Sequence, residues 1–326
     1  MQTNDMIREA HFHAAGTAAQ YWQSANELYQ WRKRHNRQGD LTAAIIALAP
    51  AVLVFGIFNI YPLLNTAFLS LFKWDGLSAE KLFVGLDNFR NLLTSDVLWN
   101  SLRATTGYTI GVTVVAVPLA LFVAVLLNTG VRFQSLYRTM YFLPVVTATV
   151  AVAVVWRYML DPGSGYLNVF LRQIGIVAPS WLRSTTWAMP AVIMVGVWKR
   201  LGFNLVVYLA ALQSIPREYY EAAQVDGAGR WDLFRRITVP LITPTTALLT
   251  VLSIIDGFLL FDQVYVMTNG GPAGATDVVG LLLYRQAFRY FDLGSASATA
   301  VIVFVIVAAL TLLQWRVSRF GAKDVS

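Results

Sequence analysis

The 326-residue sequence contains no cysteine, and only 13% of its residues are charged, where soluble domains usually carry about 25%. The missing cysteines exclude disulfide bonds and metal sites with thiolate ligands. A large soluble core would not explain so little charge, because a soluble fold still needs a charged surface. With 56% hydrophobic residues and a mean hydropathy of +0.54, the composition indicates an all-α integral membrane protein.

Histidine is also scarce: His11, His13 and His35 all lie in the first 40 residues. Two histidines two positions apart could hold a metal ion, but a solvated tail is the simpler interpretation, and we expect no metal site. The net charge of +7 is interpreted as a sign of membrane orientation, because Lys and Arg gather in the cytoplasmic loops of membrane proteins. We therefore expect a lipid bilayer, and no nucleic acid, around this chain.

Long apolar stretches predict six transmembrane helices, since a helix needs about 20 mainly apolar residues to cross a bilayer. The first begins after a tail of 40 residues and is too long for a removed signal peptide, so we expect it to be retained. Several of the stretches contain proline, which membrane helices tolerate. The six predicted spans, within a transmembrane domain of residues 41–320, are 41–63, 104–127, 138–160, 188–212, 241–266 and 296–315.

The distribution of Lys and Arg predicts that both termini lie in the cytoplasm. The tail 1–40, the loops 128–137 and 213–240 and the C-terminal end together carry more of these residues than the three loops on the other side. The tail has aromatic and apolar residues at helical spacing before a basic run, which is typical of an amphipathic helix on the inner membrane surface. A mostly disordered tail remains the alternative. The C-terminal tail is residues 321–326.

The loop 213–240 is the most polar stretch of an otherwise apolar chain. Pro216 can open a short helix, because its missing N–H costs nothing in the first turn. Gly227 breaks that helix, and Arg230 begins a second amphipathic piece. We expect a short helix, a hinge and a rigid return to the membrane, with Pro240 at the start of the fifth span.

In this loop the residues resemble a known signature. Glu221-Ala222-Ala223, followed at matching distances by Gly227, Ile237 and Pro240, is similar to the signature loop of ATP-binding-cassette (ABC) importer permeases. Val239 stands where that family usually has Leu, a conservative departure. The segments "LAALQSIP" (209–216), "FDQVYVMTNGGP" (261–272) and "FVGLDNF" (83–89) resemble carbohydrate-uptake permeases of the maltose type. The resemblance covers about residues 41–320, leaving the first 40 without a counterpart.

The resemblance implies one subunit of a larger importer. Such permeases pair with a second, homologous permease, two cytoplasmic ATPase subunits and an extracytoplasmic solute-binding protein, in a bacterial or archaeal cytoplasmic membrane. ATP and Mg would be bound by the ATPases, and the loop, as a coupling helix between spans four and five, would dock on one of them. The residues expected to couple are Glu221, Ala222, Ala223, Asp226, Gly227, Arg230, Ile237 and Pro240.

The sequence agrees with that division of labour. No lysine is followed by Ser or Thr, so the chain has no phosphate-binding loop of its own. We therefore expect a transport subunit without cofactor and without enzymatic activity.

Charged residues inside the predicted spans indicate where a solute passes, because charge at mid-membrane is costly and usually functional. Lys199 and Arg200 lie in the fourth span, and Asp256 and Asp262 in the fifth. Asp256 is expected to pair with Lys199 or Arg200, or one of the charges faces the solute. In maltose permeases, which the chain resembles, spans three to five line the sugar site. The remaining candidates are the aromatic Trp198 and Phe258, which could stack on sugars, and the hydrogen-bonding Thr147, Thr149, Asn204 and Tyr208.

Alternatives remain open. A neutral oligosaccharide is the favoured solute, while two adjacent cations could also suit an acidic glycan or a glycerol-phosphate-type solute. A secondary transporter or channel would need inward carboxylates but no Glu221 loop. A structural membrane protein would leave the mid-membrane charges unexplained.

Overall fold

The computed structural model describes residues 43–128 and 134–322, together with Asn26. The chain falls into two compact units, residues 1–65 and 66–326. The amphipathic helix expected in the N-terminal tail lies outside the described residues.

The first unit contributes a long apolar helix. It spans Ala43–Leu69, with its last residues in the second unit, and has a mean hydropathy of 2.4. A π-helical turn, η1 (Gly56–Ile60), precedes its last part, α2 (Tyr61–Leu69). At 1.5 Å per residue, 27 residues reach about 40 Å, enough to cross a hydrocarbon core of about 30 Å. The helix therefore extends beyond the predicted 41–63.

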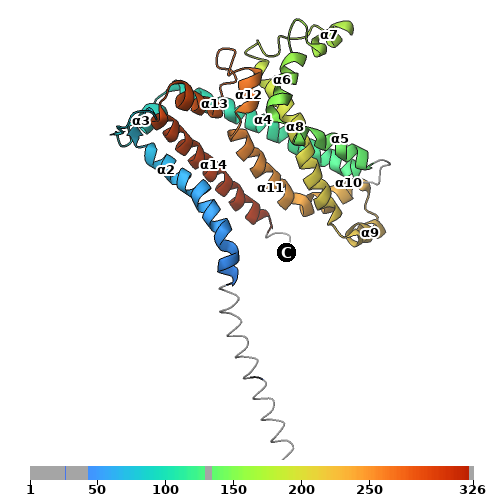
Figure 1. Cartoon of the computed structure of the whole chain (residues 1–326). Helices are drawn as coiled ribbons and strands as arrows, with labels where there is room; N and C mark the ends of the chain where they lie inside the picture. The colour runs from blue at the N-terminus through green and yellow to red at the C-terminus, as the bar shows by residue number, and fades with distance from the viewer. Residues whose placement is uncertain (1–25, 27–42, 129–133, 323–326) are drawn as a thin grey trace, which may run out of the picture. The chain divides into compact units, whose positions relative to one another are not determined.

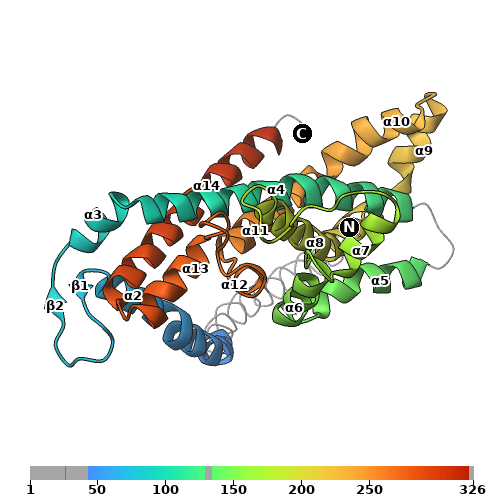
Figure 2. The same cartoon turned by 90° about the horizontal axis from the view of Figure 1, so that it is seen from above.

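Four long helices form the framework of the second unit: α4 (Asp96–Leu127), α8 (Ala188–Gln213), α11 (Val239–Phe258) and α14 (Leu293–Ala322). α4 packs along α8 and α11, and α11 also packs on α14. Figure 2 shows α4 running lengthwise through this unit beside α8. Among the described residues, five helices are long and apolar enough to cross a membrane, or six if one bent pair counts as a span. The helical membrane fold expected from the sequence is confirmed at that level.

The predicted third span, 138–160, is not one helix. It consists of α5 (Gln134–Val146) and α6 (Thr149–Met159), bent by 105°. Ala148, between them, has an extended backbone with φ −59° and ψ 128°. Thr147 donates its hydroxyl to the carbonyl of Pro144 at 2.8 Å, a bond that caps the end of α5 in place of a backbone donor. Apolar composition continues across this break, which is why hydropathy alone predicts a single span.

The helix that carries the predicted fifth span, 241–266, has other limits than that span. A continuous helical run covers Arg230–Phe258, made of α10 (Arg230–Leu233), the π turn η2 (Phe234–Thr238) and α11. The π turn lets the helix continue through Pro240, which lacks an N–H, so this proline does not mark its start. The chain leaves the helix after Phe258, and Asp262 begins a separate short helix, α12 (Asp262–Met267).

The segment after the first span is ordered. Strands β1 (Phe72–Lys73) and β2 (Leu82–Phe83) pair antiparallel and are followed by α3 (Asp87–Leu93). Asn88 donates its side-chain amide to the carbonyls of Ser70 and Phe72, both at 2.9 Å. Between the strands, the N–H groups of Ser78 and Leu77 bind Asp75 and hold the pKa of its carboxyl below the ordinary value.

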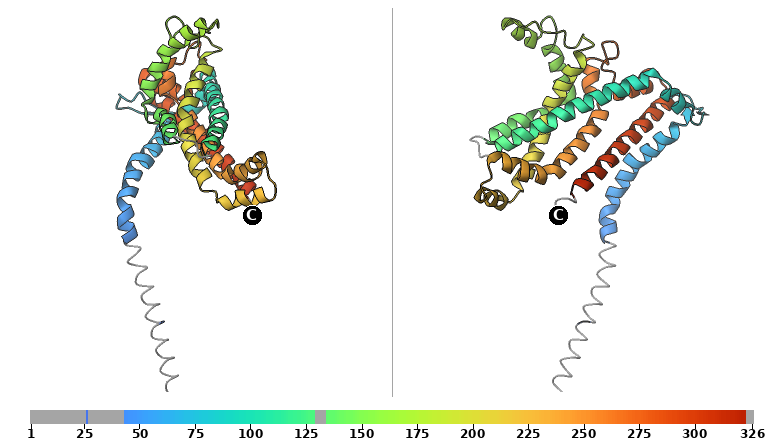
Figure 3. Two further views of the ribbon diagram at one scale, coloured as in Figure 1. Left: turned by 90° about the vertical axis from the view of Figure 1, so that its right-hand side faces the viewer. Right: turned by 180° about the vertical axis from the view of Figure 1, so that it is seen from behind.

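Shorter helices close the two ends of the second unit. α7 (Tyr166–Gln173), α12, α13 (Val279–Tyr284) and the π turn η3 (Arg285–Arg289) lie at one end. α9 (Arg217–Val225) and α10 lie at the other, where the C-terminal part of α14 also ends (Figures 1 and 3). We call these the α7 end and the α9 end.

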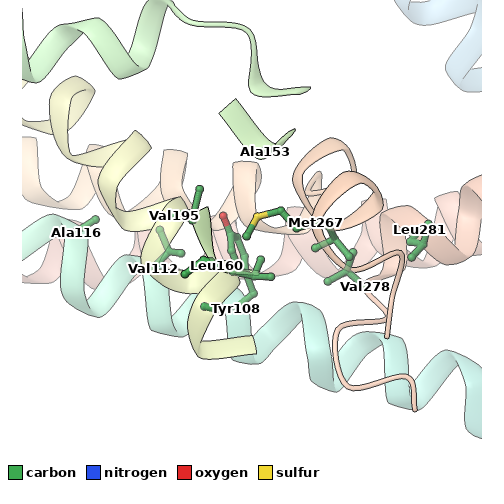
Figure 4. Close-up of a cluster of buried hydrophobic side chains, with 12 residues drawn as sticks. Tyr108, Val112, Ala116, Ala153, Leu160, Val195, Met267, Val278 and Leu281 are labelled. Carbon is green, nitrogen blue, oxygen red and sulfur yellow. The ribbon is translucent and has the colours of Figure 1, made fainter. Parts of the chain in front are cut away.

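The main hydrophobic cluster joins α4, α6, α8, α12 and α13 (Figure 4). Tyr108 and Val112 of α4 pack here, and Met267 and Leu281 close the cluster from α12 and α13. Gly196 of α8 faces Tyr108, whose hydroxyl would collide with any Cβ at that position. Close approach of this kind is how helices associate in lipid, where burial of apolar surface supplies little driving force.

An ion pair holds the α7 end together. Arg285 donates from Nη1 to both carboxylate oxygens of Asp277, at 3.0 and 2.9 Å, and from Nη2 to the carbonyl of Asn269 at 2.8 Å. The exposed fractions of the two side chains are 25% for Arg285 and 13% for Asp277. Burial raises the pKa of Asp277, and the adjacent guanidinium of Arg285 opposes that shift.

Asp277→Asn should therefore lower stability, because it leaves the half-buried guanidinium of Arg285 without its anion, at a cost between that of an exposed pair, below about 1 kcal/mol, and that of a fully buried pair, about 3–5 kcal/mol. The thermal midpoint of the purified protein measures this. Asp161→Asn is the matched control: Asp161 meets the exposed Arg183 at 3.8 Å, and an exposed pair contributes less than about 1 kcal/mol. Equal losses in the two variants would contradict a structural role for the Asp277 pair.

Candidate functional site

A cavity of about 570 Å³ lies between α4, α5, α6, α8, α11 and α12. Four charged side chains face it, two cations and two carboxylates: Lys199, Arg200, Asp256 and Asp262. Charge of both signs beside aromatic and apolar surface suits a polar solute with apolar faces. The other lining residues are Tyr108, Val112, Val145, Thr149, Gly196, Phe203, Leu252, Ser253, Gly257, Leu259, Leu260, Phe261 and Gln263.

The ion pair expected between the fourth and fifth spans is present. Arg200 of α8 donates from Nη1 to a carboxylate oxygen of Asp256 on α11. The Arg200 side chain is only 15% exposed, against 60% for Asp256. Its Nε and Nη2 atoms are buried without a hydrogen-bond partner among the described residues, and the ring centroid of Phe203 lies 5.0 Å from the guanidinium carbon. Asp256 is therefore the counter-ion of a largely buried guanidinium.

Lys199 is held differently. Its ammonium donates to the hydroxyl of Thr149, the first residue of α6. Thr149 immediately follows the break in the third span, and the first N–H groups of α6 have no partner within their own helix. The break thus brings a free helix N-terminus and a lysine to one wall of the cavity. Both features attract electron-rich oxygens of a solute.

Gln263 ties α12 to the long helices at the cavity wall. Its amide nitrogen donates to the carbonyl of Val192 at 2.7 Å, and its amide oxygen accepts from the hydroxyl of Tyr108 at 3.5 Å. On the opposite wall, Gly257 faces Thr109 so closely that a Cβ would overlap its hydroxyl. These contacts position Asp256, Phe261 and Asp262 relative to α4 and α8.

The structure places five of the ten candidate pathway residues on the cavity: Thr149, Lys199, Arg200, Asp256 and Asp262. Asp262 reaches it from α12, and not from the fifth span as predicted, because α11 ends at Phe258.

The other five candidates do not line the cavity. Phe258 is 5% exposed and packs against Val279 and Val303. Trp198 meets Trp156 edge-to-face, with ring centroids 5.7 Å apart. The remaining three are internal: Thr147 caps α5, Asn204 is fully buried, and Tyr208 donates to Thr246 at 3.0 Å.

Several cavity residues were missed by sequence reasoning, among them Tyr108, Phe203, Phe261 and Gln263. Three of them are aromatic in a chain with 13% aromatic residues, so residue type alone could not single them out. Gln263 follows the predicted Asp262 and lies within the segment 261–272, which resembles carbohydrate-uptake permeases. That resemblance was the one sequence signal that could have pointed to Gln263.

The polar loop forms the predicted short helix and hinge at the α9 end. α9 covers Arg217–Val225 and ends in a Schellman motif: the N–H of Ala228 donates to the carbonyl of Ala223 at 2.9 Å, and that of Gly227 to Gln224 at 3.0 Å. Gly227 has φ +84°, a left-handed conformation that favours glycine. Arg230 then begins the next helix.

Side-chain contacts join α9 to that returning helix. The hydroxyls of Tyr220 and Thr238 lie 3.1 Å apart, and Arg236 pairs with Asp232 at 3.4 Å. A hollow of about 360 Å³ beside the turn is lined by Ala223, Asp226, Gly227, Ala228, Asp232, Leu233, Arg236 and Ile237. Four of these eight were predicted coupling residues.

The exposed side of the loop carries Glu221 and Ala222, with Arg230 also exposed. Within the part of the chain that the structure describes, no hydrogen bond or ion pair involves the Glu221 carboxylate. Apolar side chains are exposed beside it: Val225 at 88%, Trp231 at 67% and Tyr219 at 56%. A free carboxylate among exposed apolar groups is the composition of a protein-binding surface.

Comparison with known proteins agrees with this geometry. Residues 116–320 match the family described as "Binding-protein-dependent transport system inner membrane component". The chain is 35% identical to the lactose transport system permease protein LacF of Rhizobium radiobacter, over 83% of this chain and 92% of LacF. It is 34% identical to the sn-glycerol-3-phosphate transport system permease protein UgpA of Agrobacterium fabrum, over 83% of this chain and 92% of UgpA.

The fold has a counterpart among solved structures. A chain of a bacterial ABC transporter involved in import of the acidic polysaccharide alginate superposes with a TM-score of 0.74 at 28% identity, covering 89% of this chain and 98% of that one. The resemblance to carbohydrate-uptake permeases is thereby confirmed. This chain belongs to the family of binding-protein-dependent transport system inner membrane components and is a permease subunit of an ABC importer.

Proposed function

We propose that this permease forms half of the membrane pathway for an oligosaccharide and moves it by alternating access. The cavity carries the proposal: it combines polar groups that could bind sugar hydroxyls with the rings of Tyr108, Phe203 and Phe261. Relatives named for lactose, glycerol-phosphate and alginate transport support the solute class.

The orientation that fits is a cytoplasmic α9 end in a bacterial or archaeal inner membrane. The loop 213–240, with Arg217, Arg230, Arg235 and Arg236, lies at this end, as does the C-terminal part of α14. The positive-inside rule favours this arrangement and places both chain termini in the cytoplasm.

The coupling loop would dock on an ATPase subunit. Glu221 supplies an unpaired carboxylate on α9, and the small Ala222 and Ala223 allow close approach. Gly227 fixes the turn that transmits motion to the helix beginning at Arg230, whose Ile237 and Pro240 lead into the membrane. Two ATPases would bind ATP and Mg, a second permease would complete the pathway, and an extracytoplasmic protein would deliver the solute. The binding-protein complex of the alginate transporter supports this composition.

The charges lining the cavity favour a neutral solute. Two cations face two carboxylates, and Arg200 is already paired with Asp256. One observation favours the alternative of an acidic solute: Lys199 donates to the Thr149 hydroxyl and not to a carboxylate. An anionic sugar or glycerol phosphate could therefore reach an ammonium group that forms no ion pair within the described residues, although Asp262 lines the same cavity.

Uptake by the complete importer in vesicles tests the function and separates these solutes. We expect ATP-dependent uptake of a neutral trisaccharide. In Lys199→Gln this uptake should fall less than threefold, because a neutral solute has no charge that pairs with the ammonium group. For an acidic trisaccharide, loss of a charge-assisted hydrogen bond would reduce uptake roughly 10- to 100-fold. Robust solute flux through this chain without ATPases would instead support a channel or secondary transporter.

A further inference from the structure

Four aromatic rings stand in sequence at the α7 end, and we name them the aromatic ladder: Phe261, Tyr265, Tyr284 and Phe288. The ring centroids of Phe261 and Tyr284 are 4.9 Å apart, and those of Tyr284 and Phe288 are 5.4 Å apart. Tyr265 closes the group, at 5.2 Å from Phe261 and 5.3 Å from Tyr284. The rings form two pairs four residues apart: Phe261, which precedes α12, with Tyr265, and Tyr284, which ends α13, with Phe288 in η3.

The ladder leads from the cavity to the surface. Phe261 lines the cavity beside Asp262, while Phe288, at the other end, is 66% exposed. Tyr265 and Tyr284 between them are half-buried. The ladder belongs to α12, α13 and η3, which lie outside the candidate membrane spans.

The chemistry of the ladder fits carbohydrate. Ring faces bind the apolar C–H surface of a pyranose, and phenol hydroxyls both donate and accept hydrogen bonds. Phe261 and Phe288 offer faces alone, whereas Tyr265 and Tyr284 add a hydroxyl each in the middle of the series.

We propose that the aromatic ladder is a binding subsite for the pyranose rings of an oligosaccharide on its way to the cavity. The proposal rests on the proposed carbohydrate function and adds a second site to it. The inner three rings also pack on the main hydrophobic cluster, so substituting them would change stability as well. Phe288 does not belong to that cluster, so substituting it tests sugar binding separately from stability.

Uptake kinetics of the complete importer test the subsite. Phe288→Leu keeps apolar bulk but removes the ring face, and we expect uptake of a trisaccharide at low concentration to fall roughly 2- to 10-fold. Phe288→Tyr should retain uptake, because it retains the ring. Tyr290→Leu is the matched control, since Tyr290 is 68% exposed in the same segment and stands outside the ladder. ATPase activity without solute should be equal in all three.

A second measurement is independent of transport. The chain has no cysteine, so Phe288→Cys introduces a single thiol whose labelling by a maleimide can be followed in the assembled importer. We expect a trisaccharide to slow labelling at position 288 and not in Tyr290→Cys. A thiol that is unreactive without sugar would show that another subunit covers the ladder, and labelling that sugar does not slow would also overturn the subsite.

The two proposals fail in different ways. Carbohydrate uptake by the wild type together with normal uptake in Phe288→Leu would reject the ladder alone. No carbohydrate uptake by the wild type would reject the proposed function, and the thiol-labelling result would then decide the ladder separately.

Discussion

Glu221→Lys is expected to abolish ATP-dependent uptake while the protein still inserts in the membrane. The carboxylate is exposed on α9 and has no partner among the described residues, so reversing its charge should leave the fold of this chain intact. It would place a cation where the proposed ATPase cleft supplies basic groups, and like charges across an interface cost several kcal/mol. Uptake and ATPase activity of the complete importer, with the amount of inserted protein, measure the effect.

Gly227→Pro should also abolish ATP-dependent uptake, because it changes the backbone of the turn after α9. Proline cannot adopt the φ of +84° at Gly227, and it removes the N–H that bonds Gln224. Glu218→Lys is the matched control for charge, because it makes the same change one turn earlier on α9, outside the signature. Near-normal coupled activity in Glu221→Lys and Gly227→Pro, or an equal loss in Glu218→Lys, would reject specific docking through Glu221.

Asp256→Asn is expected to cause the second large effect, a loss of assembled importer. The change leaves the Arg200 guanidinium, only 15% exposed, without its anion. A central charge in a membrane helix costs about 2.5–3.5 kcal/mol. Arg200→Gln should cost less, because the Asp256 that remains is 60% exposed. The amount of complex recovered from membranes measures both.

The double variant, Arg200→Gln with Asp256→Asn, should recover much of the lost assembly, since neither charge is then unpaired. Lys199→Gln is the control at the adjacent position, because Lys199 donates to the Thr149 hydroxyl and forms no ion pair within the described residues. Losses that simply add in the double variant would show that the pair is not what stabilises this region. A double variant that assembles normally but loses only acidic solutes would assign Arg200 to solute binding.

Much of the helix pattern was predictable, because apolar length and the spacing of turn residues are local properties. The fourth span was predicted at 188–212 and is Ala188–Gln213. The hinge at Gly227 followed from the glycine itself. Opposite charges in neighbouring spans predicted a pair of Asp256 with Lys199 or Arg200, and the structure shows that Arg200 is the partner.

The failures concern features that depend on tertiary contacts. Trp198 and Phe258 have the residue type of sugar-binding aromatics, yet neither lines the cavity: Trp198 packs against Trp156 and Phe258 against Val279. Hydropathy depends on composition and does not show where a helix ends. The predicted fifth span therefore continued past Phe258, where α11 ends, into α12. Two ring neighbours of Tyr284, Phe261 and Tyr265, lie about twenty residues earlier in the chain, and no local pattern indicates such a pairing.

The break between α5 and α6 bears on how the chain enters the bilayer during synthesis. With 13 and 11 residues, the two halves are about 20 and 16 Å long at 1.5 Å per residue, and neither crosses about 30 Å of hydrocarbon alone. The exposed backbone groups at Ala148 are tolerated in lipid only where protein or a water-filled cavity surrounds them. Stable integration of this segment should therefore wait until α8 has emerged from the ribosome. In a nascent chain truncated after residue 165, we expect the two earlier spans to be inserted but the segment α5–α6 to stay outside the hydrocarbon core.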